Sequence, residues 1–313
     1  MKGYIFKRVL AAIPILMFVG VVAFSLVHIA PGDPANIIGG DYAGPDDIIK
    51  IRKELGLDKP IATQFWDWVR RTARGDLGNS IFSNQPVTKL IGQRMGATLS
   101  LTIAGGVMAV IIGVPLGVMA AWKANTLLDR AAQVYAALGI SIPGFWLGFI
   151  LLWAFAVNIR IFSVIGYVPI TEDVAGFIKG MTLPTLLLGI GGSSVIVRMT
   201  RSAMLEVFRE DYIRTARAKG LHERAVLFRH ALRAGAIPIL TVIGFLSAGL
   251  ITGAVVVETV FTISGLGRLV AEAVQQRDFP IFQSLLMLLA GFYVIINLLV
   301  DLSYAYIDPR VRL

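Results

Sequence analysis

Apolar residues occur along this chain in six long, predominantly apolar stretches, and the segments between them hold most of the charged residues. An α-helix rises about 1.5 Å per residue and the hydrocarbon core of a bilayer is roughly 30 Å thick, so about 20 apolar residues suffice to cross it. The pattern therefore predicts an all-α polytopic membrane protein with six transmembrane helices. Their approximate ranges are Val9–Ile29, Leu99–Ala121, Ala131–Val157, Leu183–Ala203, Ile237–Phe261 and Ile281–Tyr306.

The amino-acid composition agrees with a membrane location and excludes several kinds of functional site. Apolar residues make up 56% of the 313 positions and charged residues 16%, which is far too apolar a balance for a soluble surface. Cysteine is absent, so disulfides, thiolate metal ligands and cysteine nucleophiles are excluded. The net charge is +9. These charges lie at the ends of apolar runs, which argues against a nucleic-acid partner.

The first apolar stretch follows Lys2, Lys7 and Arg8, an arrangement that also occurs in secretory leaders. Its length exceeds the roughly 7–15 residues of a leader core. The sequence Val-His-Ile-Ala-Pro at 27–31 lacks the pattern of small residues that a cleavage site requires. We expect an uncleaved first span.

The distribution of lysine and arginine predicts the orientation. An N-terminus in the cytoplasm places residues 122–130, 204–236 and 307–313 inside, and these segments with the adjoining span ends are rich in arginine and lysine. The two short outer loops, 158–182 and 262–280, hold only Arg160, Lys179, Arg268 and Arg277. We therefore expect both termini in the cytoplasm of a bacterial cell, with the chain in its inner membrane.

The segments differ in character and suggest four parts. Residues 1–30 are the N-terminal end with the first span, and residues 31–98 are a small external insert. Residues 99–307 form a core of five helices that includes an inner loop at 206–235, and residues 308–313 are a cytoplasmic tail. Proline at positions 31 and 34 ends the first helix. Within the insert we expect short helices at Pro45–Leu55 and about Ala62–Thr72.

Small residues recur at intervals of four in the second span, and this places them on one face of the helix. They are Gly105, Ala109, Gly113, Gly117 and Ala121, and Gly249 and Gly253 repeat the spacing in the fifth span. Close helix packing is the expected role. Prolines that can begin or kink helices lie at Pro115, Pro143, Pro184 and Pro238.

The inner loop 206–235 predicts two helices separated by a glycine. Residues from Asp211 to Lys219 suit a short helix that Gly220 ends after basic residues, and His222 to Arg233 suit a second helix. Four roles compete for this loop: a topology determinant, a surface for anionic lipid heads, a cap on the bundle, or a docking site for a partner.

The order of residues in the loop resembles the permease subunits of binding-protein-dependent ABC importers. The hallmark of that family is Glu-Ala-Ala, three residues, Gly, nine residues, then Ile-x-Leu-Pro. Only Ala216, Gly220 and Leu232 match this generic pattern. The dipeptide and oligopeptide branch is more similar, over seven segments in order. These are HIAPGDP (28–34), GDLGNS (75–80), YIRTARAKGL (212–221) with RHALR (229–233), VVVETVF (255–261), GLGRL (265–269), RDFPIFQ (277–283) and DPRVRL (308–313).

The resemblance implies the type I ABC importer permease fold and a set of partners. These are a second homologous permease subunit in a heterodimer, two cytoplasmic ABC ATPase subunits, a periplasmic or extracellular peptide-binding protein, and membrane lipid. The chain has no Gly-x-x-x-x-Gly-Lys-Ser/Thr motif, so we expect ATP and magnesium on the ATPase subunits and no cofactor, catalytic residue or metal site here.

The same resemblance makes the short helix at 211–219 a coupling element that enters a cleft of the ATPase. Thr215, Ala216 and Gly220 are its expected contact or shape residues, with Arg214, Arg217 and Glu210 as further candidates. A carboxylate is costly to bury in lipid, so Glu258, near the outer end of the fifth span, is a candidate functional residue. Its position suits an outer gate or a contact with the binding protein, and a structural or interfacial role is the alternative.

Two other classes of protein compete with an importer permease. An intramembrane enzyme requires a catalytic motif within the spans, and His-Glu-x-x-His, Gly-x-Gly-Asp and Gly-x-Ser-Gly are all missing there. An ion-coupled carrier usually has ionisable groups in mid-membrane and often has inverted repeats, and neither feature is detected in this sequence. For the importer the expected substrates are dipeptides, oligopeptides or glutathione, and nickel chelates or sugars are the alternatives.

Overall fold

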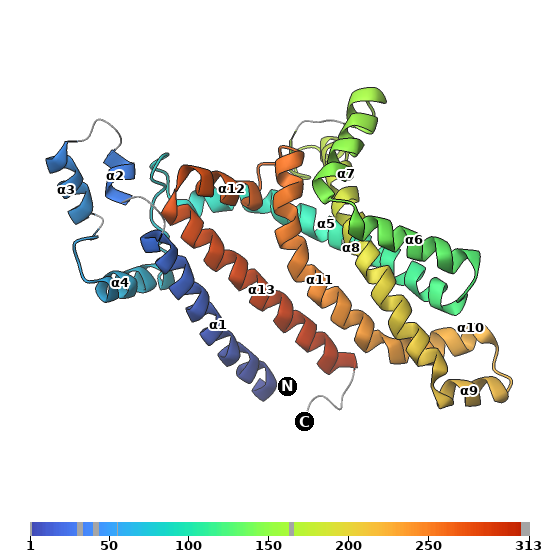
Figure 1. The fold of residues 1–313 in the computed structure, drawn as a ribbon. Helices are drawn as coiled ribbons and strands as arrows, with labels where there is room; N and C mark the ends of the chain where they lie inside the picture. Colours follow the sequence, from blue (N-terminus) through green and yellow to red (C-terminus); the bar gives the residue numbers. More distant parts are fainter. Residues whose placement is uncertain (1, 30–33, 40–43, 55, 163–165, 308–313) are drawn as a thin grey trace. The chain divides into compact units, whose positions relative to one another are not determined.

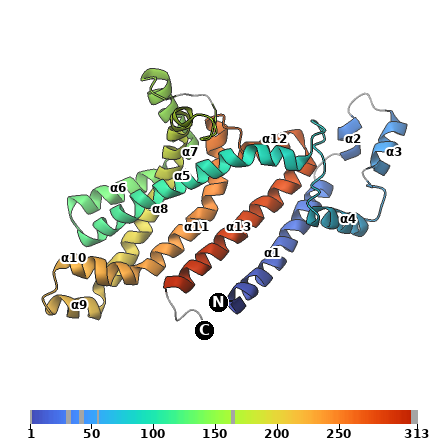
Figure 2. The same cartoon turned by 180° about the vertical axis from the view of Figure 1, so that it is seen from behind.

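The computed structural model describes residues 2–29, 34–39, 44–54, 56–162 and 166–307. This part of the chain is helical apart from turns, loops and one isolated β-bridge between Asn79 and Pro86 (Figures 1 and 2). The α-helices are α1 Lys2–Ile29, α2 Pro34–Gly39, α3 Pro45–Glu54, α4 Ile61–Ala73, α5 Val87–Trp122, α6 Leu127–Ser141, α7 Gly144–Leu151, α8 Val174–Arg209, α9 Asp211–Ala218, α10 Glu223–Ala225, α11 Leu232–Val260, α12 Leu266–Gln276 and α13 Phe279–Ile307, and the π-helical segments are η1 Leu152–Asn158 and η2 Val226–Ala231. The motif at 308–313, the predicted tail and residues 30–33 of HIAPGDP lie outside the described residues.

Five of the six predicted spans are continuous helices in the structure. Each has the length and hydropathy to cross a membrane, and they lie at Leu10–Ile29, Val87–Trp122, Val174–Arg209, Glu223–Val260 and Phe279–Ser303. Three of them are much longer than the apolar stretches that predicted them. Helices α5 and α8 begin well before Leu99 and Leu183, and the last turns of the inner loop continue without a break into α11.

The third predicted span differs from a single continuous helix. Helices α6 and α7–η1 are long and apolar enough to cross a membrane only together, and they are bent by 102° where they meet. Ile142 leaves the helical region, with φ −78° and ψ 123°, directly before Pro143. Proline disfavours helical conformation in the residue before it and donates no backbone hydrogen bond, so the break falls here. The chain has six spans if this bent pair counts as one.

The contacts divide the chain into two compact units. One contains residues 1–5, 96–268 and 295–313, and the other contains residues 6–95 and 269–294. Helices α1, α5 and α13 each give residues to both units. This division follows packing rather than membrane topology, so the four topological parts expected from the sequence stay a prediction.

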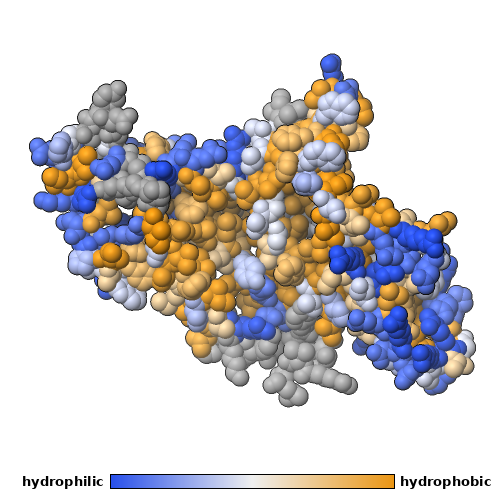
Figure 3. All heavy atoms as spheres, in the orientation of Figure 1, coloured by the Kyte–Doolittle hydropathy of each residue, from blue (hydrophilic) through white to orange (hydrophobic). Residues whose placement is uncertain are grey.

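Helix α8 is central to the packing of the first unit. It packs against α6 and α11, and its side chains at Leu183, Leu187 and Leu188 enter a buried cluster with Val257 and Phe261. The end of this unit that carries α9 and α10 is hydrophilic in the view of Figure 3, while hydrophobic residues cover much of its remaining visible surface.

The small-residue face of the second span makes a close helix contact, as its spacing predicted, and the partner helix is α8. A Cβ atom added to Gly113 would lie 2.6 Å from Cβ of Ile196, and one added to Gly117 would lie 2.8 Å from Cβ of Thr200. Gly105 meets Leu188 in the same way. Glycines four or eight residues apart on α5 therefore meet residues with the same spacing on α8, and only small residues allow the two backbones to approach so closely.

The second unit contains both short helices predicted in the insert, with α3 at Pro45–Glu54 and α4 at Ile61–Ala73. Aromatic residues join α4 to α1, because the ring of Phe24 lies 5.3 Å from Phe65 and 6.0 Å from Trp68 between centroids. Helix α13 joins them through Gln283, whose Nε2 donates to the carbonyl oxygen of Ala23 at 3.3 Å.

Helix α12 was not predicted, because its eleven residues were assigned to a short outer loop. Its residues 269–276 belong to the second unit. There Glu272 accepts a hydrogen bond from Arg94 at 2.7 Å, and just beyond the helix Asp278 accepts one from Ser80 at 2.6 Å. The GDLGNS and RDFPIFQ segments, 198 residues apart in the chain at this bond, thus meet.

Candidate functional site

The segment between the fourth and fifth spans begins with a one-residue corner at Glu210. This residue ends α8 and begins α9, with φ −65° and ψ 143° in extended conformation. Its carbonyl oxygen accepts from the backbone N–H of Ile213 at 3.0 Å, while its side chain is exposed. Along the backbone, a single extended residue therefore joins α9 to α8.

Helix α9 is held to the rest of its unit by one face. Ile213 and Ala216, three residues apart and so on the same side of the helix, are buried. They enter a cluster formed by Val118 and Ala121 of α5, Met204 of α8, Val226, Leu227 and Ala231 of η2, and Ile239 of α11. Ala216 is thus a shape residue of the interior in this structure, and its side chain does not lie on the exposed face.

The opposite face of α9 is exposed and polar. Asp211, Tyr212, Arg214 and Thr215 lie there, and the hydroxyl of Thr215 donates to the carbonyl oxygen of Asp211 at 2.9 Å. Tyr212 is 44% exposed. Partial burial, and after it the negative charge of Glu210, raise the pKa of the Tyr212 phenol above its ordinary value. The phenol therefore remains a neutral hydrogen-bond donor at physiological pH.

Gly220 ends this helix in the left-handed region, with φ +77°. Its N–H donates to the carbonyl oxygen of Arg217 at 2.9 Å, and the next N–H, that of Leu221, donates to Ala216 at 3.3 Å. A Cβ added at Gly220 would meet no atom of the described residues within 4 Å. Glycine is therefore favoured here by backbone conformation and not by lack of space.

Arg217 connects the residues on either side of the glycine. Its Nε donates to Oε1 of Glu223 at 2.9 Å, and its guanidinium lies 5.9 Å from the centre of the Phe208 ring. Arg214, by contrast, forms a long, exposed ion pair with Asp211 at 3.6 Å. Arg214 is therefore the freer of the two predicted arginines to contact another protein, since exposed pairs of this kind contribute little energy.

The second predicted helix of the loop is the start of the fifth span. Helix α10, the π-helical segment η2 and α11 follow one another without a gap from Glu223 to Val260. The apolar pattern of this helix predicts burial of Val226, Leu227, Ala231 and Leu232. The first three are buried, while Leu232 is only partly buried. The π-helical turns, which occur often at functional positions, lie in the part of this helix that packs against α9.

Glu258, the second candidate site, is fully buried at 0% exposure. Its Oε1 accepts from the hydroxyl of Thr98 at 2.6 Å and its Oε2 accepts from the N–H of Arg268 at 2.9 Å. The backbone N–H of Leu266 donates to the Thr98 hydroxyl at 2.7 Å. The carboxylate thus joins α5, the end of α11 and the turn that follows, and in this structure its side chain lies away from any surface that a binding protein could touch.

Two glycines of the GLGRL segment make room for this carboxylate. A Cβ at Gly265 would overlap the carboxyl group of Glu258, and one at Gly267 would lie 2.5 Å from Cα of Val255 and 2.9 Å from Oε2 of Glu258. The sequence pattern did not identify Thr98 or these glycines as partners of Glu258. A glycine pair just after a buried acidic residue is the signal that could have indicated them.

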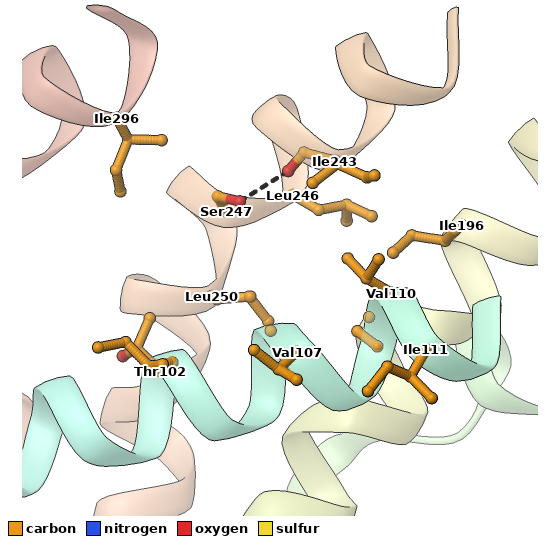
Figure 4. Close-up of a pocket in the computed structure, with 14 residues that line it drawn as sticks. Thr102, Val107, Val110, Ile111, Ile196, Ile243, Leu246, Ser247, Leu250 and Ile296 are labelled. Carbon is orange, nitrogen blue, oxygen red and sulfur yellow. Dashed lines mark hydrogen bonds between the residues drawn. The ribbon is translucent and has the colours of Figure 1, made fainter. Parts of the chain in front are cut away.

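A cavity of about 430 Å³ lies in the first unit, between α5, α8, α11 and Ile296 of α13. Figure 4 shows Val107 and Val110 of α5 facing Leu246 and Leu250 of α11 across it. Its polar groups are the hydroxyls of Thr102 and Ser247, and the latter donates to the carbonyl oxygen of Ile243 at 2.8 Å. Among the described residues that line this cavity, none is charged.

Within the described residues no three His, Cys, Asp or Glu side chains are grouped so that they could hold a metal ion. The long apolar helices, the tightly packed α5 and α8, and the one-sided burial of α9 define the class of molecule. It is a polytopic helical membrane protein with a short helix, exposed on one face, between its fourth and fifth spans.

The chain belongs to the family of binding-protein-dependent transport system inner membrane components. The model of that family matches residues 113–313, and the model of its N-terminal part matches residues 1–102. The chain is therefore a multi-pass membrane protein and a transport permease, and not an enzyme.

Named relatives are similar over the whole chain. The probable peptide ABC transporter permease protein y4tP of Sinorhizobium fredii is 45% identical, and the match covers 100% of both chains. The dipeptide transport system permease protein DppB of Alkalihalophilus pseudofirmus is 39% identical over 100% of both chains. The glutathione transport system permease protein GsiC of Salmonella typhi is 40% identical over 100% of this chain and 99% of the relative.

A solved structure shares the fold. A chain of the methionine ABC transporter MetNI, in inward-facing conformations, superposes with a TM-score of 0.58 and 18% identity, covering 71% of this chain and 97% of that chain. The permease fold of a type I ABC importer, expected from the sequence, is confirmed.

Proposed function

We propose that this chain is one of the two transmembrane subunits of an ATP-binding-cassette importer that moves short peptides across a bacterial inner membrane. Its partners are a second, homologous permease subunit in a heterodimer, two cytoplasmic ATPase subunits that bind ATP and magnesium, and a periplasmic or extracellular peptide-binding protein. Family membership supports the class. The names of relatives that are 39–45% identical over their full length support the substrate.

One observation carries the mechanism: α9 is anchored by one face and exposed on the other. The buried side chains of Ile213 and Ala216 tie it to α5, α8 and η2, while Tyr212, Arg214 and Thr215 are exposed. A rigid helix of this kind can receive a push from an ATPase subunit and pass it to several spans at once. ATP binding then favours the permease arrangement that the closed ATPase dimer contacts better.

The orientation follows from the same assignment. An ATPase that uses cellular ATP requires α9 in the cytoplasm, and the arginine-rich character of residues 204–236 agrees with an inner position. When α6 and α7–η1 form one span, an even number of spans separates α9 from each terminus. Both termini are then cytoplasmic and residues 31–98 form an external insert. The same arginines are available to the headgroups of anionic lipids.

We propose short peptides as the substrate, and not nickel chelates or sugars, because the named relatives carry peptide, dipeptide or glutathione in their names. The described lining of the cavity between α5, α8 and α11 has no charged residue, so it offers no ionic site that would select the charged ends of a substrate. This supports selection by the external binding protein.

Glu258 is buried at the end of α11 and accepts a hydrogen bond from the backbone N–H of Arg268 in the segment that follows. It acts in a gate by holding that segment in place.

The proposal is tested by purifying the complex through a tagged copy of this chain and reconstituting it in proteoliposomes. Uptake is measured with a radiolabelled dipeptide, a tripeptide, glutathione, a nickel chelate and a sugar, each with the binding protein and with the membrane potential collapsed. We expect peptide uptake that requires ATP on the side of α9 and disappears when the ATPase lysine of the phosphate-binding loop is replaced. Uptake that follows an ion gradient without ATP would instead identify a carrier.

A further inference from the structure

Asp129, in the first turn of α6, has no role in the function described so far. It is 1% exposed and forms a two-pronged ion pair with Arg201 of α8. Nε of Arg201 donates to Oδ1 at 2.5 Å and Nη2 donates to Oδ2 at 2.8 Å. This parallel arrangement is the strongest and most directional contact between arginine and carboxylate.

The remaining hydrogen-bonding capacity of the carboxylate is also used. The backbone N–H of Asn125 donates to Oδ2 at 2.9 Å, and Nε2 of Gln133 donates to Oδ1 at 3.0 Å. Asn125 has φ +66° in the turn between α5 and α6. Asp129 therefore fixes that turn and the start of α6, and Arg201 fixes both to α8.

The position of the pair relates it to α9. Arg201 lies about two turns before α8 ends at Arg209, and α9 begins at Asp211. The end of α5, at Val118 and Ala121, packs in the same buried cluster as α9. The pair thus joins α8 to α6 near α9. Helix α9 is connected to α6 by two routes, one through α8 and the ion pair and the other through the end of α5 and the α5–α6 turn.

Other contacts between α6 and α8 involve small or uncharged side chains. Ala132 and Ala136 pack against Val197, a Cβ at Gly139 would overlap the hydroxyl of Ser194, and the hydroxyls of Tyr135 and Ser193 lie 2.5 Å apart. These contacts hold the two helices close together, and the two-pronged ion pair adds a strongly directional contact at the end of α8 that is nearer to α9.

We propose that Asp129 and Arg201 are a positioning pair that makes the α5–α6 turn, α8 and α9 move as one body. A push on α9 then displaces α6, and with it the bend at Pro143, together with α8. The inference rests on the proposed function, since it concerns how force from the ATPase reaches the spans. Without the pair, α9 still docks and ATP is still hydrolysed, but fewer peptides cross for each ATP.

The test compares peptide import and ATP hydrolysis by the complete complex in proteoliposomes, with binding protein and the radiolabelled dipeptide. For Asp129→Asn, which keeps the shape of the side chain, we expect the ratio of dipeptide imported to ATP hydrolysed to fall about tenfold while hydrolysis stays within about twofold of wild type. Arg198→Gln is the matched control, because it removes an exposed arginine three residues earlier on the same helix. Its ratio remains that of the wild type.

A second variant decides the matter if Asp129→Asn does not assemble. Arg201→Lys keeps the charge opposite Asp129 and loses only the two-pronged geometry, and we expect normal assembly with a ratio lowered about threefold. An unchanged ratio in a variant that assembles, or equal falls in import and hydrolysis, would overturn the positioning role. Absence of ATP-driven import in the wild-type complex is a separate result, which contradicts the proposed function itself.

Discussion

The hydroxyl of Thr98 donates to Oε1 of Glu258 at 2.6 Å and accepts from the backbone N–H of Leu266 at 2.7 Å. One hydroxyl thus satisfies a buried carboxylate and a buried amide at the same time. Groups left without a hydrogen-bond partner in an apolar interior lose the full free energy of solvation. Thr98 should therefore contribute far more to stability than a threonine whose hydroxyl has no such partner.

We expect Thr98→Val to lower the free energy of unfolding by about 2 kcal/mol, since it leaves both partners with one hydrogen bond fewer. Thr102, one turn further along α5, provides the control, because its buried hydroxyl has no hydrogen-bond partner among the described residues. Thr102→Val should leave the free energy of unfolding unchanged or raise it by about 1 kcal/mol, because it removes a buried hydroxyl that has no partner among the described residues. Denaturant unfolding of the purified variants in the same detergent measures both, and equal effects at the two positions would contradict the arrangement.

The contact between α5 and α8 gives a second prediction. Gly113→Ala places a methyl group 2.6 Å from Cβ of Ile196 and 3.1 Å from the carbonyl oxygen of Ser193, so the helices must separate. We expect a loss of about 2 kcal/mol in the free energy of unfolding. Gly191→Ala, on α8, adds a carbon that has no described atom within 4 Å apart from its chain neighbours and the nearby backbone of its own helix. This substitution should be neutral or stabilising by up to about 1 kcal/mol. Thermal unfolding of the two variants checks the difference, and a stable Gly113→Ala variant would show that these helices do not pack so closely.

The sequence is most informative where a local rule determines the structure. Runs of about 20 apolar residues indicate spans whatever their neighbours, and basic residues followed by Gly220 indicate a helix end from backbone geometry alone. The four-residue spacing on the second span likewise indicated a close helix contact, although not that α8 was the partner.

Features that depend on distant partners could not be predicted in this way. Glu258 meets Thr98 across 160 positions of the chain, and Asp129 meets Arg201 across 72, so no short pattern contains both members. Helix α12 has an amphipathic sequence without a long apolar run, and its position in a connection between spans obscured it. The 102° bend before α7 was indicated only by Pro143, whose effect on direction depends on the packing around it.

Gly220 separates the effect of backbone conformation from that of side-chain size. Its φ is +77°, and an added Cβ would have open space among the described residues. Gly220→Asn should therefore retain most transport, because asparagine tolerates the left-handed region. Gly220→Val should lower peptide import at least about tenfold, because a β-branched residue strains that region and reshapes the end of α9. Membrane insertion should be normal in both. Import by reconstituted complexes, with the amount of membrane-embedded protein measured in parallel, tests this, and wild-type import by Gly220→Val would refute the coupling assignment.

The two faces of α9 predict opposite effects for neighbouring residues. Ile213 is fully buried in the cluster that α9 packs against. Ile213→Ala should therefore lower the free energy of unfolding by about 3 kcal/mol and weaken the packing of α9 on that cluster.

Tyr212, the preceding residue, is 44% exposed. Tyr212→Ala should leave stability within about 0.5 kcal/mol of the wild type, and should weaken binding of the ATPase subunits about tenfold, because exposed aromatic residues often carry much of the binding energy of an interface. Unfolding in detergent and binding of purified ATPase subunits to the permease pair in nanodiscs separate the two effects. Equal loss of stability in both variants would contradict the buried and exposed faces of α9. Unchanged ATPase binding by Tyr212→Ala would show that Tyr212 is not part of the surface that the ATPase contacts.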